Sequence, residues 1–162
     1  MQKGDKTSLV LHVNDREYSV SVEARQSLAD VLRDECHLTG THIGCEHGVC
    51  GACTVLLDGK PVRSCLMFAV QATEHKVRTV EGLAKNNELH PMQRAFWDHH
   101  AVQCGFCTPG FLMLAIGAVE ANPDLSERDI KALLSSNLCR CTGYHNIANA
   151  VRAGATEMKS CR

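Results

Sequence analysis

The sequence predicts an α+β protein in which a half built mainly of strands precedes a half built of short helices. In the first half, Leu9, Leu11 and Val13 alternate with polar residues, which is the pattern of a strand with one buried face. In the second half, apolar residues recur with helical spacing, as between Phe111 and Val119. Apolar residues make up 44% and charged residues 22% of the 162 residues, which suits a folded chain with a core.

Strands and one short helix are predicted in the first half. A β-hairpin comes first, because Asn14-Asp15 separates two runs of alternating residues. Ser27 can cap a helix whose apolar residues share one face, namely Leu28, Val31 and Leu32. The remaining strands are predicted at Thr54 to Leu57, from Val62 onward after an Asp58-Gly59 turn, and at Val77 to Val80.

Four short helices are predicted in the second half. Pro91 suits the first position of one helix, and Thr108-Pro109 starts another that ends at Asn122-Pro123. Ser126 and Asp129 resemble a capping box for the third helix. The last helix carries Ile147, Val151 and Met158. The polar stretch 80–89 reads as a linker, so we expect two domains, 1–82 and 83–162.

Charge and apolar content limit the classes of protein to which the chain can belong. The net charge is −1 and no Lys/Arg block occurs, so we expect no nucleic-acid surface. The apolar run from Phe111 to Val119 is much shorter than the roughly 20 residues of a membrane span. Residues 1–8 do not resemble a secretory signal, so we expect a cytoplasmic protein, although export of the folded chain with a partner stays open.

Ten cysteines are the most unusual feature, and several lie too close together for independent disulfide bridges. In a reducing compartment, clustered cysteines usually bind metal or catalyse redox chemistry. The first group has the spacing C-x4-C-x2-C-x11-C, formed by Cys45, Cys50, Cys53 and Cys65. C-x4-C-x2-C is the plant-type [2Fe–2S] spacing, and Gly44, Gly48 and Gly51 let the backbone wrap closely around a centre.

The second group has the spacing C-x2-C-x31-C-x-C, formed by Cys104, Cys107, Cys139 and Cys141. The first pair precedes the Thr108-Pro109 helix, whose N-terminal N–H groups favour anionic thiolates. The second pair follows the helix that contains Ile130 and Leu134. Two helix-end loops brought together would therefore form one site with four thiolates.

Other roles for these residues stay open on the pattern alone. Four thiolates also suit structural zinc, although C-x-C is an awkward zinc pair. A redox-active C-x-x-C pair at Cys104 and Cys107 leaves Cys139 and Cys141 unexplained. His47 could replace a ligand as in Rieske centres, but four cysteines are already present. The remaining candidates are assigned no site role: Cys36 as a small buried residue, Cys161 as an exposed tail residue, Glu46, Arg140 and the His99-His100 pair.

Both cysteine patterns together resemble the small iron–sulfur subunit of the xanthine oxidase family of molybdenum hydroxylases. The matching stretches run in order along nearly the whole chain, from Gly44 to Thr54, from Gln103 to Gly110 and from Asn137 to Tyr144. The resemblance implies an N-terminal β-grasp, plant-type ferredoxin-like domain and a C-terminal four-helix [2Fe–2S] domain. It also implies two [2Fe–2S] clusters, held by the eight cysteines of the two groups.

The resemblance further implies two partner subunits, a large one with a molybdenum–pterin dinucleotide and a medium one with FAD, in a heterotrimer or its dimer. Gln103 matches the glutamine that hydrogen-bonds the pterin, and Cys139 matches the cluster ligand closest to the pterin amino group. The chain would relay electrons from the molybdenum centre to FAD and would not be catalytic alone. The substrate of the complex could be an N-heteroaromatic ring, an aldehyde or CO. The alternative is an independent ferredoxin-like carrier, against which the small net charge argues.

Overall fold

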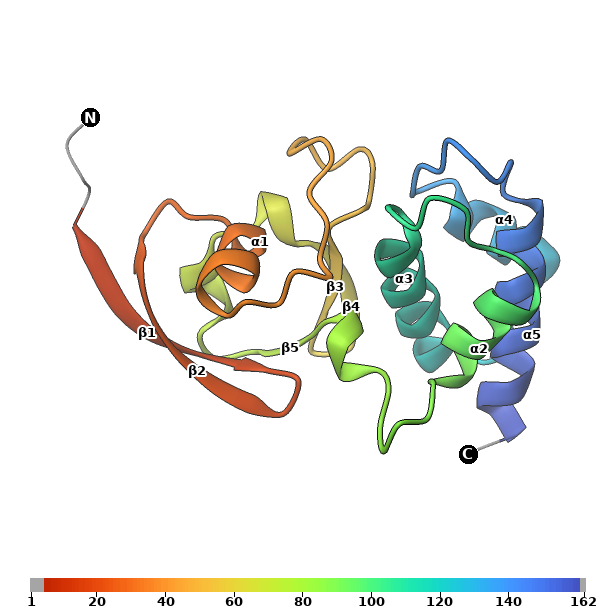
Figure 1. Ribbon diagram of the computed structural model, residues 1–162, viewed down its shortest axis with the longest axis horizontal. Helices are drawn as coiled ribbons and strands as arrows, with labels where there is room; N and C mark the ends of the chain where they lie inside the picture. Colours follow the sequence, from red (N-terminus) through yellow and green to blue (C-terminus); the bar gives the residue numbers. More distant parts are fainter. Residues whose placement is uncertain (1–4, 161–162) are drawn as a thin grey trace.

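The computed structural model describes residues 5–160, and its first half forms a single five-stranded sheet (Figure 1). The order of the strands is β2-β1-β5-β3-β4. Neighbouring strands are antiparallel except for β1 and β5, which run parallel. The strand bounds are Lys6–Val13 (β1), Arg16–Glu23 (β2), Thr54–Leu57 (β3), Lys60–Arg63 (β4) and Lys76–Arg78 (β5).

The predicted hairpin is confirmed, with a two-residue turn between β1 and β2. Asn14 and Asp15 have φ values of 52° and 62°, the left-handed conformation that a type I′ turn requires. The Asn14 side chain donates to Thr79 Oγ1 at 2.8 Å and accepts from the Thr79 N–H at 2.9 Å. The hairpin turn is thereby attached to the segment after β5.

The predicted helix after Ser27 is also confirmed, but it is short. Ser27 accepts from the Asp30 N–H at 3.1 Å and caps α1 (Leu28–Asp30). The chain then widens into a π-helical turn at Val31–Glu35, in which the Cys36 N–H donates to the Val31 carbonyl. The side chain of Cys36 lies in the sheet core, and burial followed by the Glu35 charge raises its pKa to about 11. The assignment of Cys36 as a small buried residue is confirmed.

The strand prediction at Val77 to Val80 is wrong at its end. β5 stops at Arg78, and Val80 starts a 3₁₀ turn, Val80–Gly82. The Gly82 N–H donates to the Thr79 carbonyl at 3.0 Å and the Leu83 N–H to the Val80 carbonyl at 3.2 Å. Local turn bonds therefore replace the sheet bonds that a longer strand would make.

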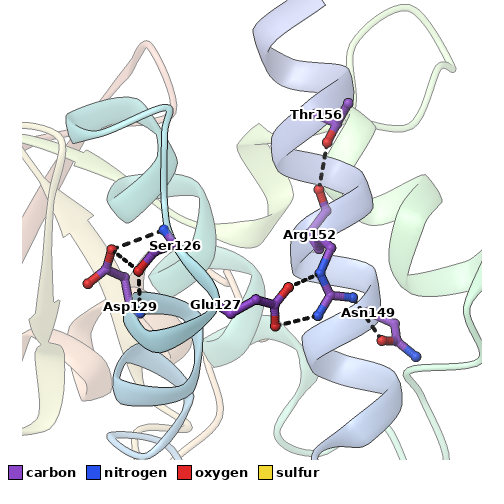
Figure 2. A network of polar contacts seen from close by, with 6 residues as sticks. All are labelled: Ser126, Glu127, Asp129, Asn149, Arg152 and Thr156. Carbon is purple, nitrogen blue, oxygen red and sulfur yellow. Dashed lines mark hydrogen bonds and ion pairs between the residues drawn. The ribbon is translucent and has the colours of Figure 1, made fainter.

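Four helices follow, as the capping residues predict: α2 (Pro91–Asp98), α3 (Thr108–Ala121), α4 (Glu127–Leu134) and α5 (His145–Ser160). Ser126 and Asp129 form the predicted capping box at α4 (Figure 2). Glu127 of α4 forms a bidentate ion pair with Arg152 of α5. Arg152 also donates to Asn149 Oδ1 at 3.0 Å. The Glu127 and Arg152 side chains are exposed, so their ion pair contributes little to the stability of the fold.

Helix α3 lies between the sheet and the other helices (Figure 1). It is buried nearly all round, with residues such as Phe111, Met113 and Ile116 in the helical core. That core also takes Leu56 from β3, so the sheet contributes a residue to it. A second core lies between the sheet and α1. The arrangement is α+β, with the β-grasp sheet and the helical bundle that the resemblance implies.

Within residues 5–160, none of the helices has the length and apolar character that a membrane crossing requires.

Candidate metal centres

The first cysteine group lies in a long loop between the π-helical turn and β3. Glu46, Gly48 and Gly51 have φ values of 55°, 78° and 72°, so the chain turns sharply around the three cysteines of the loop. The fourth cysteine, Cys65, comes from the 3₁₀ turn Ser64–Leu66 that follows β4. An added Cβ atom at Gly48 would lie 2.5 Å from Leu66 Cδ1, so the loop approaches this turn closely.

The four thiols of this group interact in two pairs. The thiols of Cys45 and Cys50 lie close enough to shift each other's pKa, and Cys53 lies close enough to Cys65 to add to the rise that burial causes in the pKa of Cys65. The two pairs also lie near each other. In addition to burial, the charge of Cys53 raises the pKa of Cys50, and the charge of Cys45 raises the pKa of Cys65. The structure therefore brings together the four residues that the sequence predicts as one ligand set.

Backbone N–H groups point at the sulfur of Cys45. The N–H groups of Cys50 and His47 each lie 3.4 Å from Cys45 Sγ, and these bonds lower its pKa to about 6. Burial acts in the opposite direction on Cys65, whose pKa it raises to about 11 together with the neighbouring thiols. The loop thus supplies donors that stabilise negative charge on sulfur, which is what a thiolate ligand needs.

The second cysteine group joins the N-terminal end of α3 to the loop between α4 and α5. Cys107 directly precedes α3, and Cys139 and Cys141 lie before α5. Cys104 Sγ and Cys141 Sγ are 3.6 Å apart, and the Cys107 thiol lies close enough to Cys139 for that neighbour to raise its pKa. These four thiols therefore also interact in two pairs.

The two inner thiols of this second group have different environments. Burial and then the hydrogen bond with Cys139 raise the pKa of Cys107 to about 12, so the nearby helix end does not dominate there. Burial also raises the pKa of Cys139, but hydrogen bonds from Thr142 and neighbouring groups outweigh it, and the pKa is lowered. The Thr142 hydroxyl lies 3.1 Å and its N–H 3.4 Å from Cys139 Sγ.

The pairing within each group fits a centre with two irons. In a [2Fe–2S] cluster four cysteine thiolates bind two irons, two to each. In the described part of the chain, His, Cys, Asp and Glu side chains do not gather in threes or more around a point where one ion could bind. Within each group the two pairs of thiols match this division of four ligands between two irons.

The other candidate residues do not join the thiol groups as ligands. Glu46, Arg140, His99 and His100 are exposed. The ring of His47 is also exposed, and its Nδ1 forms a hydrogen bond with the Cys45 carbonyl. Gln103 is exposed beside Cys104, where a partner could reach it. Cys161 lies outside the described residues.

The sequence did not predict a set of contacts between the two cysteine loops. The Leu138 N–H donates to the Cys50 carbonyl at 2.9 Å. The Asn137 amide donates to the Gly51 carbonyl at 3.1 Å, and Arg63 donates to the Ser136 carbonyl at 2.7 Å. The only available signal was the position of Asn137 and Leu138 directly before Cys139.

Comparisons with known proteins agree with this arrangement. A 2Fe-2S iron-sulfur cluster binding domain matches residues 11–84, and a [2Fe-2S] binding domain matches residues 79–152. The gamma subunit of caffeine dehydrogenase from Pseudomonas sp. (strain CBB1) is 55% identical over 146 residues, which cover 88% of this chain and 87% of that subunit. The small subunit of nicotine 6-hydroxylase from Paenarthrobacter nicotinovorans is 53% identical over 147 residues, covering 91% of this chain and 88% of that subunit.

A solved structure extends the agreement to the fold. One chain of the quinoline 2-oxidoreductase of Pseudomonas putida 86 superposes with a TM-score of 0.92 at 45% identity, covering 97% of this chain and 98% of that one. The matched relatives are subunits of oxidoreductases, and their similarity extends over both cysteine groups. This chain therefore belongs to the small iron–sulfur subunits of the xanthine oxidase family of molybdenum hydroxylases, proteins with two [2Fe–2S] domains.

Proposed function

We propose that this chain relays electrons, one at a time, from a molybdenum–pterin centre in a large partner subunit to FAD in a medium partner subunit. The observation that carries the proposal is the grouping of eight thiols into two neighbouring sets, joined by a backbone hydrogen bond between their loops. Each [2Fe–2S] cluster, when bound, accepts and releases a single electron.

Two ligand sets and two domains follow from the proposal. Cys45, Cys50, Cys53 and Cys65 hold the first cluster within domain 1–82. Cys104, Cys107, Cys139 and Cys141 hold the second within domain 83–162. The N–H donors at Cys45 and the Thr142 groups at Cys139 stabilise the thiolates and contribute to the two reduction potentials.

The second site faces the molybdenum subunit in this proposal. Gln103 is exposed next to Cys104, so its amide is free to hydrogen-bond a pterin held by the partner. Cys139 is the ligand closest to that pterin. Neither residue breaks a substrate bond; Gln103 positions the pterin, and Cys139 connects it to the relay.

Exposed apolar residues next to the ligands support docking of partners at both sites. Beside the first group, Val49, Leu66 and Phe68 are 63%, 60% and 51% exposed. Beside the second, Val102, Phe106 and Leu138 are 41%, 48% and 51% exposed. Covering these residues would bury apolar surface and exclude water from the clusters, which favours a stable complex over a transient carrier.

We further propose an N-heteroaromatic substrate for the complex, in preference to an aldehyde or CO. Relatives at 45–55% identity are named for caffeine, nicotine and quinoline, all of which contain nitrogen heterocycles, whereas the aldehyde oxidoreductases that match are 38–42% identical. The residues that select the substrate belong to the large subunit. We place the complex in the cytoplasm as a heterotrimer or its dimer.

Purification of the native complex through a tag on this chain tests the proposal. We expect a particle much heavier than 17.7 kDa that contains molybdenum and FAD, and whose flavin is reduced when a nitrogen heterocycle is added. Isolation of the chain as a monomer from a gentle native extract would instead support the independent carrier. A complex without FAD would contradict the relay to flavin while leaving the iron–sulfur role intact.

A further inference from the structure

The backbone at Tyr144 adopts a conformation that a bulky residue rarely takes. Its φ is 67°, in the left-handed region, and within residues 5–160 it is the largest non-glycine residue at positive φ. Tyr144 directly precedes α5, and its carbonyl accepts from the Ala148 N–H at 2.9 Å. Such outliers persist only where the surrounding contacts hold them, and they cluster at functional positions.

The contacts that hold Tyr144 form a ring of hydrogen bonds around Cys139. The Cys139 N–H donates to the Tyr144 hydroxyl at 3.0 Å. The Tyr144 N–H donates to Thr142 Oγ1 at 3.2 Å, and Thr142 Oγ1 in turn lies 3.1 Å from Cys139 Sγ. The ring therefore starts at the backbone of Cys139 and returns to the sulfur of the same residue.

The Thr142 hydroxyl is the donor to the sulfur once iron is bound. A thiolate that binds iron carries no hydrogen, so Cys139 Sγ can then only accept. Thr142 Oγ1 already accepts from the Tyr144 N–H, which leaves the hydrogen of the hydroxyl to point at Cys139 Sγ. Tyr144 thus fixes the direction in which Thr142 donates.

The Tyr144 side chain is anchored in the helical core. It is partly buried against that core, and its ring meets the ring of Phe111 edge to face, with centroids 6.3 Å apart and planes at 73°. Phe111 belongs to α3 and is fully buried. The hydroxyl that accepts from the Cys139 N–H is therefore attached to a rigid part of the fold, and it holds the backbone of Cys139 in place.

We propose that Tyr144 is a positioning residue that aims the Thr142 hydroxyl at Cys139 Sγ and thereby raises the reduction potential of the second cluster. This inference rests on the proposed relay. On reduction, one ferric ion becomes ferrous and the site gains one negative charge, while no bond breaks and no proton moves. A hydrogen bond donated to a ligand sulfur stabilises that charge and favours the reduced form. In the relay, the higher potential favours entry of the electron from the molybdenum subunit.

Tyr144→Phe tests the positioning role, because it removes the oxygen that accepts from Cys139 and keeps the ring. In the assembled complex, a redox titration followed by EPR gives the potential of each cluster. We expect the equilibrium of the second cluster to shift several-fold toward the oxidised form, with the iron content and the first cluster unchanged. Tyr18→Phe is the matched control, since it removes the same atom from the other tyrosine of the chain, which packs against the sheet core. It should leave both potentials at the parental values.

Thr142→Val and Thr142→Ser test the group through which Tyr144 acts. Valine has nearly the shape of threonine but no hydroxyl, whereas serine keeps the hydroxyl. We expect Thr142→Val to disfavour reduction of the second cluster about tenfold, which is about 59 mV for a one-electron couple, and Thr142→Ser to stay near the parent. The double variant of Thr142→Val with Tyr144→Phe should shift the potential no further than Thr142→Val alone.

A Tyr144→Phe complex with both clusters and the parental potentials would overturn the proposal, and so would additive shifts in the double variant. If Tyr144→Phe does not retain the second cluster, the Thr142 variants decide, because a parental potential in Thr142→Val would equally overturn it. Absence of a second cluster from the parent would instead refute the proposed relay, so the two failures are distinguishable.

Discussion

The carbonyl oxygen of Gly51 lies 2.3 Å from the position that a Cβ atom on Gly110 would occupy. Gly110 is in the first turn of α3, three residues after Cys107, and Gly51 lies between Cys50 and Cys53. The neighbouring atom is backbone and cannot rotate away. The absence of a side chain at position 110 is therefore what allows α3 to approach the first cysteine loop so closely.

Gly110→Ala is expected to destabilise the chain. Alanine favours a helix over glycine by about 1 kcal/mol, but the clash with backbone belongs to the class of overpacking that costs about 1–3 kcal/mol. Thermal unfolding of the loaded protein measures the difference. Gly154→Ala is a comparison with a milder clash, because its added Cβ atom would meet the Met92 side chain, with Sδ at 2.6 Å, while the nearest backbone atom, Met92 Cα, would be 3.1 Å away. Equal stability of Gly110→Ala and the parent would contradict the close approach.

Much of the fold could be predicted because its signals are local. The Asn14-Asp15 turn, the Ser27 cap and the Ser126–Asp129 box each act within a few residues of the element that they start or end. The end of β5 could not be predicted in this way. Val80 does not extend the strand because the N–H groups of Gly82 and Leu83 form local turn hydrogen bonds. The alternation of apolar residues gives no information about these hydrogen bonds.

The two cysteine groups could be predicted, but the contact between them could not. The members of the first group lie close together in the chain, and its spacing already indicates a common centre. The hydrogen bond from Leu138 to Cys50 joins residues far apart in sequence. It depends on how α3 packs between the sheet and the other helices, and no local pattern encodes that packing.

Separate ligand sets predict that Cys141→Ser removes only the second cluster. The hydroxyl of serine is a poorer iron ligand than a thiolate, so the site that pairs Cys141 with Cys104 should lose its iron. EPR of the reduced protein should then show the signal of the first cluster alone. Cys36→Ala is the control and should retain both signals, since Cys36 lies in the sheet core away from both groups. Loss of both clusters from a folded Cys141→Ser protein would refute the partition.

Gln103→Ala should leave both clusters in place and slow electron entry from the molybdenum subunit. Gln103 is exposed and lies outside the thiol groups, so the iron content and both EPR signals should not change. Single-turnover reduction of the clusters by substrate should become slower. Lys131→Ala, which is exposed on α4 and outside both cysteine groups, should reduce at the parental rate. An unchanged reduction rate in Gln103→Ala would contradict the proposed contact between Gln103 and the pterin.

His90 gives the stability of α2 a dependence on pH. The neutral ring caps the helix by accepting from the Met92 N–H at 3.2 Å, and burial followed by the Arg78 charge lowers its pKa from 6.5. The unfolded chain therefore takes up a proton at higher pH than the folded one. The contribution of the cap is fully present above pH 6.5 and is lost as the pH falls through the lower folded pKa.

His90→Asn should remove this dependence, because asparagine caps a helix without titrating. The difference in unfolding free energy between the parent and His90→Asn should shift by up to about 1 kcal/mol between about pH 8 and pH 5.5, to the disadvantage of the parent at the lower pH. Comparing the two proteins cancels the acid lability that the clusters give to both. A difference that stays constant over this range would contradict the role of the neutral ring.

The central claim is tested most directly by assay of iron and acid-labile sulfide in the isolated protein, combined with EPR after reduction by dithionite. The account predicts about four irons and four sulfides per chain, with two distinguishable [2Fe–2S] signals. Zinc in place of iron, or one cluster only, would contradict it. At least one group of thiols would then have a structural role, and the relay would lack its second cluster.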